Sequence, residues 1–214
     1  MKKHAFKASL YLNGVFVILF LALGFRFKEK IIQKILDTKE KATIVQFGDS
    51  IIKEGDWNEL LGRNDIKNSG FGGFTTSHFR WLIKKNVIDY EPEICFIKGG
   101  INDISVGIPL ERIQFNYISL LDTLRSYNIL PVVQSTLYQE NNPQSKILVD
   151  SLNDFLIDYC QENSIQFLDI NSKLSTDSGL KAEYSRDGTH LKEGAYLIWG
   201  KEMKELLDEI ESSR

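Results

Sequence analysis

Thr43-Ile44-Val45-Gln46-Phe47-Gly48-Asp49-Ser50 is the stretch that decides the fold. Threonine, isoleucine, valine and phenylalanine favour a pleated strand, and Gly48 permits a sharp turn where that strand ends. Ser50 then stands at the carboxyl end of the strand, which is where open α/β sheets bind their ligands. A serine there can act on a ligand, but Asp49 and Ser50 can equally cap a following helix. The other segments of the sequence decide between a catalytic role and a capping role for Ser50.

The composition indicates one soluble globular domain with an appendage. The chain has 214 residues, 43% of them hydrophobic, and a formal net charge of −3. Residues 1–30 hold six Lys/Arg and one Glu, so the remainder carries a net charge of −8. A domain this acidic is a poor partner for nucleic acid, whose phosphates need clustered lysine and arginine. The two cysteines, Cys95 and Cys160, show neither metal-ligand spacing nor a disulfide framework.

The N-terminus is predicted to be an anchoring or targeting segment. Early lysines precede an apolar run from about Leu10 to Phe25, which is short for a spanning helix. We expect residues 1–27 to form an uncleaved signal-anchor, with a cleaved signal peptide and a secreted domain as the alternative. Residues 28–42 read as a charged stalk, and residues 43–214 as the domain. The lysines would keep the N-terminus in the cytoplasm and place that domain outside the cytoplasm. The chain would then associate with the membrane through its N-terminal segment.

From Thr43 onward the sequence alternates strands and helices, which favours a parallel sheet with right-handed crossovers. Apolar runs predict strands, and apolar residues at helical spacing predict helices. The expected strands are 43–47, 65–68, 94–97, 129–134 and 165–168, and the expected helices are 56–61, 75–87, 110–127, 144–162 and 192–211.

Four polar or glycine-rich segments fall where an expected strand gives way to a helix or where the last helix begins. Each has an ordinary structural explanation: a cap, a tight turn, an Asx turn or an exposed histidine. Each also has a catalytic one, because a serine nucleophile needs a base, an orienting carboxylate and oxyanion donors. The segments are Ser50, Gly70-Phe71-Gly72-Gly73, Gly99-Gly100-Ile101-Asn102-Asp103 and Asp187-Gly188-Thr189-His190.

The order of these segments resembles that of the SGNH (GDSL) hydrolase family over roughly residues 43–210. The matching blocks are 47–50, 68–76, 99–103 and 187–190, and the stretch 55–62 resembles members similar to platelet-activating-factor acetylhydrolases and carbohydrate acetylesterases. The resemblance implies a flavodoxin-like three-layer α/β/α sandwich with about five parallel strands. It also implies ester hydrolysis through an acyl-enzyme, with no metal and no other cofactor.

Carried over residue by residue, the resemblance makes Ser50 the nucleophile, His190 the base and Asp187 the group that orients His190. The oxyanion hole would use the backbone N–H groups of Ser50 and Gly73 and the side chain of Asn102. One position departs from the family, since Phe74 stands where an aspartate usually supports the oxyanion loop. That departure puts the rigidity of the loop in question.

The substrate follows less directly from the sequence. Asp49, Trp57 and Phe74 are the candidates for contact with it, although each aromatic residue can equally belong to the core. We expect a small-molecule or glycan ester carrying a short acyl group, with acetyl first in line. The alternatives are a lysophospholipase or other lipid esterase, and a non-catalytic binding domain on the same fold.

Overall fold

The computed structural model describes residues 41–213 together with residues 20, 24, 26 and 28. The chain divides into two units, residues 1–40 and residues 41–214, and the fold below is that of the second unit. Apart from the few residues named, the predicted anchor and stalk lie outside the described residues. Within the part that is described, no helix is long and apolar enough to cross a membrane.

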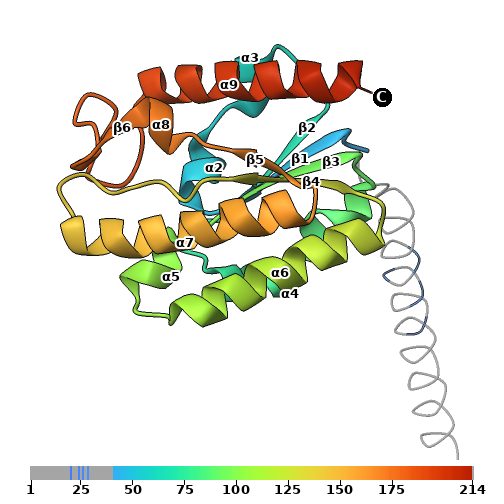
Figure 1. The fold of residues 1–214 in the computed structure, drawn as a ribbon. Coiled ribbons are helices and arrows are strands. Elements are labelled where there is room, and N and C mark those ends of the chain that lie inside the picture. Colours follow the sequence, from blue (N-terminus) through green and yellow to red (C-terminus); the bar gives the residue numbers. More distant parts are fainter. Residues whose placement is uncertain (1–19, 21–23, 25, 27, 29–40, 214) are drawn as a thin grey trace, which may run out of the picture. The chain divides into compact units, whose positions relative to one another are not determined.

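The centre of the domain is a five-stranded parallel sheet with the order β2-β1-β3-β4-β5. Helices cover both of its faces, so the domain is a three-layer α/β/α sandwich (Figure 1). This arrangement confirms the parallel α/β sandwich predicted from the sequence. The strands are β1 (Ile44–Gly48), β2 (Ile66–Gly70), β3 (Ile94–Lys98), β4 (Leu130–Gln134) and β5 (Gln166–Leu168).

Every residue of β1 and of β3 is buried, as expected for strands covered on both faces. Their side chains alternate between two hydrophobic cores because successive residues of a strand point to opposite faces. Val45 and Phe47 join the core on one face of the sheet, whereas Ile44 and Phe96 join the core on the other face.

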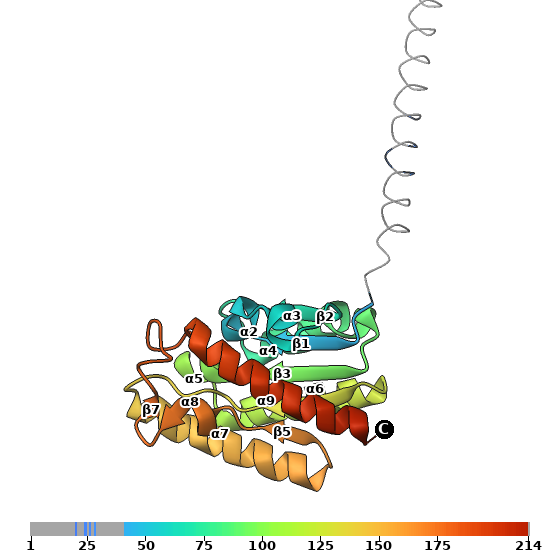
Figure 2. The same cartoon turned by 90° about the horizontal axis from the view of Figure 1, so that it is seen from above.

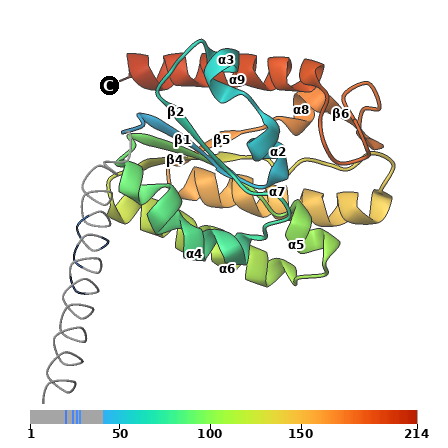
Figure 3. The same cartoon turned by 180° about the vertical axis from the view of Figure 1, so that it is seen from behind.

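The first of these cores is covered by α4 (Thr76–Asn86), α6 (Leu110–Ser126) and α7 (Pro143–Glu162). The apolar stripe expected on α6, which includes Ile113, Tyr117 and Leu121, is buried in it. The opposite face carries α2 (Ser50–Glu54), α3 (Trp57–Leu61) and α9 (Glu193–Ser212). Figure 2 looks down on this second layer, and Figure 3 shows both helical layers from behind.

Several short elements were not expected from the sequence. They are α5 (Ile101–Ser105), the 3₁₀ turn η1 (Ile88–Tyr90), α8 (Asn171–Leu174) and the small hairpin of β6 (Ser175–Thr176) and β7 (Gly179–Leu180). Elements of two to five residues are too short to show hydrophobic periodicity. Two of them matter for function, because α5 carries Asn102 and the hairpin precedes the Asp187–His190 turn.

The order in which strands are added to the sheet changes direction at β1. The chain places β2 on one side of β1 and then crosses to place β3 on the other side. The three strands run in register, with Gly48 opposite both Gly70 and Lys98. The segments that follow them therefore emerge together at the carboxyl edge of the sheet. This is the switch point at which doubly wound folds form their ligand sites.

Candidate active site

Ser50 is the first residue of α2, directly after the turn that ends β1. Asp49 is the N-cap residue and accepts the backbone N–H of Ile51 at 3.0 Å. Gly48 has no room for a side chain, because a Cβ there would lie 2.4 Å from the carbonyl oxygen of Lys98. The turn therefore needs glycine and leaves the half-buried Ser50 at the carboxyl edge of the sheet.

His190 lies beside Ser50, although 140 residues separate them in the sequence. The distance from its Nε2 to Ser50 Oγ is 3.0 Å. Its Nδ1 lies 2.9 Å from Asp187 Oδ2 and 3.1 Å from Oδ1. Because the Asp187 carboxylate accepts a hydrogen bond from Nδ1, the neutral imidazole carries its proton on Nδ1. Its Nε2 can then accept a hydrogen bond from the serine hydroxyl. The three side chains thus form the hydrogen-bonded series that activates a serine for nucleophilic attack.

The Asp187 carboxylate is held by the backbone of its own turn as well. The N–H of His190 donates to Oδ1 at 2.8 Å and the N–H of Thr189 at 3.2 Å. The His190 N–H is the main reason that the pKa of Asp187 lies well below its ordinary value. The carboxylate stays ionised and can stabilise a positive charge on the imidazole.

The glycine-rich loop after β2 meets α5 at the same edge. The Asn102 side-chain amide donates to the carbonyl oxygen of Phe74 at 2.9 Å, and an amide nitrogen has a second N–H to offer. Gly73 has φ = 73°, a conformation that suits glycine. Ser50 begins a helix, so its own N–H has no partner within that helix. The structure thus gathers the three predicted oxyanion donors on adjoining segments.

Asp103 supports this loop, and its role was missed by the sequence analysis. Its buried carboxylate accepts the backbone N–H of Thr76 at 2.9 Å and the Thr76 hydroxyl at 2.6 Å. Asn116 in turn donates to that hydroxyl at 2.9 Å. Burial raises the pKa of Asp103, and the bonds from Thr76 oppose that shift. The acidic residue directly after Asn102 was the available sequence signal.

Phe74 also helps to support this loop, although it stands where the family resemblance led us to expect an aspartate. Its half-buried ring stacks on Phe71, with centroids 5.4 Å apart, and lies 4.9 Å from the ring of His78. His78 closes a capping box at the start of α4, accepting the N–H of Thr75 at 3.1 Å. Ring stacking and the bonds of Asn102 and Asp103 therefore fix the loop without the usual carboxylate. Phe74 remains at the site, so its contact with substrate stays a prediction.

Two of the three proposed substrate contacts are wrong. Asp49 is fully buried and forms an ion pair with Lys98, with Nζ to Oδ2 at 3.0 Å. Burial lowers the pKa of Lys98, and Asp49 opposes that shift. Trp57 is only 1% exposed and packs against Trp199 and Tyr196 of α9. Neither side chain can reach a substrate, because each is sealed in the interior beneath α2.

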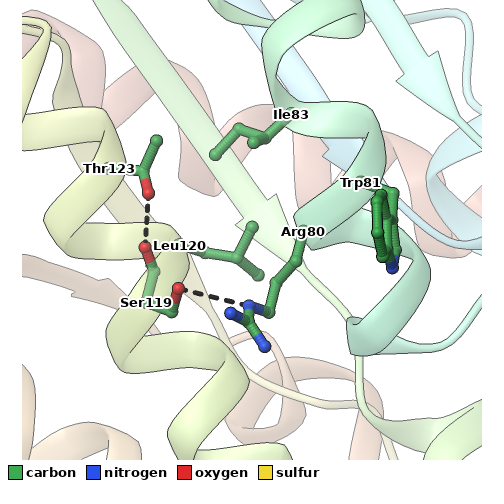
Figure 4. Close-up of a pocket in the computed structure, with 6 residues that line it drawn as sticks. All are labelled: Arg80, Trp81, Ile83, Ser119, Leu120 and Thr123. Carbon is green, nitrogen blue, oxygen red and sulfur yellow. Dashed lines mark hydrogen bonds between the residues drawn. The ribbon is translucent and has the colours of Figure 1, made fainter.

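A separate groove lies between α4 and α6, with a volume of about 370 Å³ (Figure 4). Arg80 lies in it and bonds Ser119 on the facing helix at 3.2 Å, while the indole of Trp81 is exposed. None of the residues predicted for the active site lines this groove.

Comparison with known proteins places the sequence in one family. Residues 46–198 match the profile of the GDSL-like Lipase/Acylhydrolase family, which is most of the chain. The chain belongs to the GDSL-like lipase/acylhydrolase family. This is the family that the four sequence blocks predicted.

Curated proteins match the chain over part of their length. An N-acylneuraminate cytidylyltransferase of Streptococcus agalactiae serotype V is 29% identical over 120 residues, or 55% of this chain. The match spans only 29% of the length of that relative.

Solved structures share the fold. A GDSL-like lipase from Bacteroides thetaiotaomicron has a TM-score of 0.70 at 20% identity, covering 78% of this chain and 88% of its own. A catalytic mutant of an acetylxylan esterase from Geobacillus stearothermophilus has a TM-score of 0.66 at 16% identity, covering 78% and 94%. At these identities the likeness shows the fold alone.

Proposed function

We propose that this GDSL-like hydrolase removes short acyl groups, acetyl foremost, from the hydroxyls of a glycan or glycoside. The observation that carries the proposal is the series from Ser50 Oγ through His190 to Asp187, with links of 3.0 and 2.9 Å. Both links are within the reach required of a nucleophile, its base and the group that orients the base.

The reaction proceeds in two steps. Ser50 Oγ attacks the ester carbonyl while His190 Nε2 takes its proton, and the sugar hydroxyl then leaves with that proton from His190. The acyl group is now bound to Ser50. In the second step a water molecule gives a proton to His190 and attacks the acyl-enzyme. Ser50 leaves, recovers its proton from His190, and the carboxylic acid is released. Asp187 stabilises the imidazolium in both steps.

The oxyanion of each tetrahedral intermediate is held by three donors in this proposal. They are the N–H of Ser50, the N–H of Gly73 and the second N–H of the Asn102 amide. Its first N–H holds the Phe74 carbonyl, which fixes the direction of the second. Donors fixed in this way stabilise the transition state without reorganising when the charge develops.

The exposure of the site supports a short acyl group. The side chains of His190 and Asp187 are 27% and 47% exposed, and Gly72 and Gly73 lie at the surface. A methylene group contributes about 0.8 kcal/mol to binding only when it leaves water. The nearby connection 137–142 is mostly polar, with Gln139, Glu140, Asn141 and Asn142. Such surroundings favour acetyl over a long acyl chain.

Sugar-bound esters are supported by the relatives. One is named for its action on N-acylneuraminate, a sugar acid, and another is named as an acetylxylan esterase. Both names describe those proteins. For this chain they make acetylated sugars the first substrates to test, in line with the polar residues around the turn.

The location of the enzyme is part of the same proposal. Residues 1–27 would anchor the chain and leave the hydrolase domain outside the cytoplasm, with secretion after cleavage as the alternative. A protease added to intact cells should then digest the domain. Protection of the domain from that protease would place it in the cytoplasm.

The decisive experiment compares p-nitrophenyl acetate, octanoate and palmitate, followed by acetate release from O-acetylated neuraminic acid and acetylated xylan. We expect the highest kcat/KM with the acetate ester, and acetate release from one of the glycans. A kcat/KM that rises with acyl length would favour a lipid esterase. Failure of Ser50 to react with a fluorophosphonate probe would favour a binding domain. Ser50→Ala is the matched control throughout.

A further inference from the structure

Arg186 joins two parts of the site that are 132 residues apart in the sequence. Its guanidinium contacts both carboxylate oxygens of Glu54, with Nη1 to Oε2 at 3.0 Å and Nη2 to Oε1 at 3.1 Å. Glu54 is the last residue of α2, whose first residue is Ser50. Arg186 directly precedes Asp187. The ion pair therefore connects the helix that carries the nucleophile to the turn that carries the base.

Arg186 also contacts the turn itself. Its backbone N–H donates to the carbonyl oxygen of His190 at 2.8 Å, which closes the loop containing Asp187. Its Nη2 lies 3.6 Å from Asp187 Oδ2. A displacement of Arg186 would therefore shift both Asp187 and His190.

We propose that Arg186 and Glu54 form a clamp that sets the distance between Ser50 Oγ and His190 Nε2. The role is one of positioning, and it rests on the proposed function of those two residues. The planar guanidinium binds a carboxylate through two parallel contacts, so it fixes orientation as well as distance. A single ammonium group provides no such orientation.

The effect of the clamp should appear in catalysis more than in stability. The Arg186 and Glu54 side chains are partly exposed, and ion pairs of this kind add little to the free energy of unfolding. Catalysis is more sensitive, because a displacement of about 1 Å at a reacting group can cost about 10²-fold in rate. Loss of the clamp should therefore lower kcat while the domain stays folded.

The charges of the clamp provide a second, independent readout. The ionisable groups facing Arg186 are Glu54, Asp187 and the hydroxyl of Tyr196 on α9, which donates to the Ile51 carbonyl at 2.7 Å. Removing the positive charge of Arg186 favours a protonated imidazole, so the acid limb of the pH–rate curve should move to higher pH. Removing the negative charge of Glu54 should move that limb to lower pH. A general loosening of the loop would not shift the limb in opposite directions.

The test measures kcat, KM and the pH–rate midpoint with p-nitrophenyl acetate for Arg186→Gln, Glu54→Gln and the double variant. Each single change should lower kcat about tenfold and leave KM within about twofold. The double variant should lose no more than the worse single variant, since both changes break the same contact. Arg186→Lys keeps the charge but not the two-point contact. It should retain the wild-type midpoint with a reduced kcat.

Arg63→Gln is the matched control. Arg63 contacts Asp65 at 2.8 Å and Glu211 at 2.9 Å, and so joins other elements by an ion pair of similar geometry. Its loss should leave kcat and the midpoint unchanged. The clamp is refuted if Arg186→Gln keeps the wild-type kcat, if the two single losses add, or if Arg63→Gln is equally impaired. Absence of Ser50-dependent turnover in the wild type would instead refute the proposed function.

Discussion

Asn102→Ala is the change that most directly tests the geometry of the oxyanion hole. The substitution removes two N–H groups with different partners. One donates to the Phe74 carbonyl at 2.9 Å, and the other is assigned to the oxyanion. A lost oxyanion donor costs about 2.7–4 kcal/mol of transition-state stabilisation, equivalent to a factor of about 10²–10³ in kcat. A lost neutral hydrogen bond costs about 0.5–1.5 kcal/mol of folding free energy.

These two losses can be measured separately. The kcat at saturating p-nitrophenyl acetate reports the oxyanion donor, whereas urea unfolding reports the bond to Phe74. We expect kcat to fall about 10²–10³-fold with a much smaller change in KM, because the oxyanion exists only beyond the ground state. The free energy of unfolding should fall by about 1 kcal/mol.

Ser105→Ala is the control for a change elsewhere in α5. Ser105 lies in the same short helix and donates its hydroxyl to the Ile101 carbonyl at 2.8 Å, with no part in the proposed oxyanion hole. It should leave kcat unchanged and change the free energy of unfolding only slightly, because Ser105 is exposed and alanine favours the helix. An Asn102→Ala variant that changes only KM would make Asn102 a ground-state binding residue. An equal loss of kcat in Ser105→Ala would attribute the defect to loosening of α5.

Four further outcomes follow from the structure. Ser50→Ala should abolish turnover and leave the unfolding midpoint nearly unchanged, because Ser50 is only half-buried; wild-type turnover in that variant would remove Ser50 from the mechanism. Activity should rise with pH through a single ionisation near neutrality and survive EDTA, since a histidine base acts when unprotonated and the lowered pKa of Asp187 keeps its carboxylate ionised over that range. Loss on chelation and recovery with zinc would contradict a metal-independent reaction. Lys98→Met should lower the free energy of unfolding, measured with urea, by about 3–5 kcal/mol, because it leaves Asp49 buried and unpaired. The double variant Asp49→Asn/Lys98→Met should recover much of that loss. Trp57→Ala should also lower the free energy of unfolding by about 3–5 kcal/mol, because Trp57 is buried. A raised KM with an unchanged free energy of unfolding would instead assign Trp57 to the substrate site.

The larger elements of the fold could be predicted because their signals are local. The apolar run at Ile94–Ile97 became the fully buried β3, and the stripe on 110–127 became the buried face of α6. The predicted ends of these two elements differ from the observed ones by at most one residue. Helix α5 could not be predicted, since five residues are too few for a period of 3.6 to be detected.

Part of the candidate site could be predicted because Ser50 and Asn102 follow the ends of β1 and β3, and a parallel sheet brings such positions to one edge. His190 instead precedes α9, and its place in the site was expected from the order of the sequence blocks. The contacts between them depend on packing that no local pattern describes. The support of the Phe74 loop by Asp103 and by the Phe71 ring appears only when β2, α4 and α5 are placed together.

The sequence by itself determined the succession of strands and helices and the positions of the candidate nucleophile, base and carboxylate. Hydrophobic periodicity and turn residues act over a few neighbours, so one chain segment is enough to reveal them. Tertiary structure decided which polar and aromatic residues are inside. Trp57 is buried by α9, and Asp49 is paired with Lys98 at the end of another strand. Burial and pairing depend on residues far apart in the chain, because the hydrophobic effect acts on whichever surfaces the completed fold removes from water.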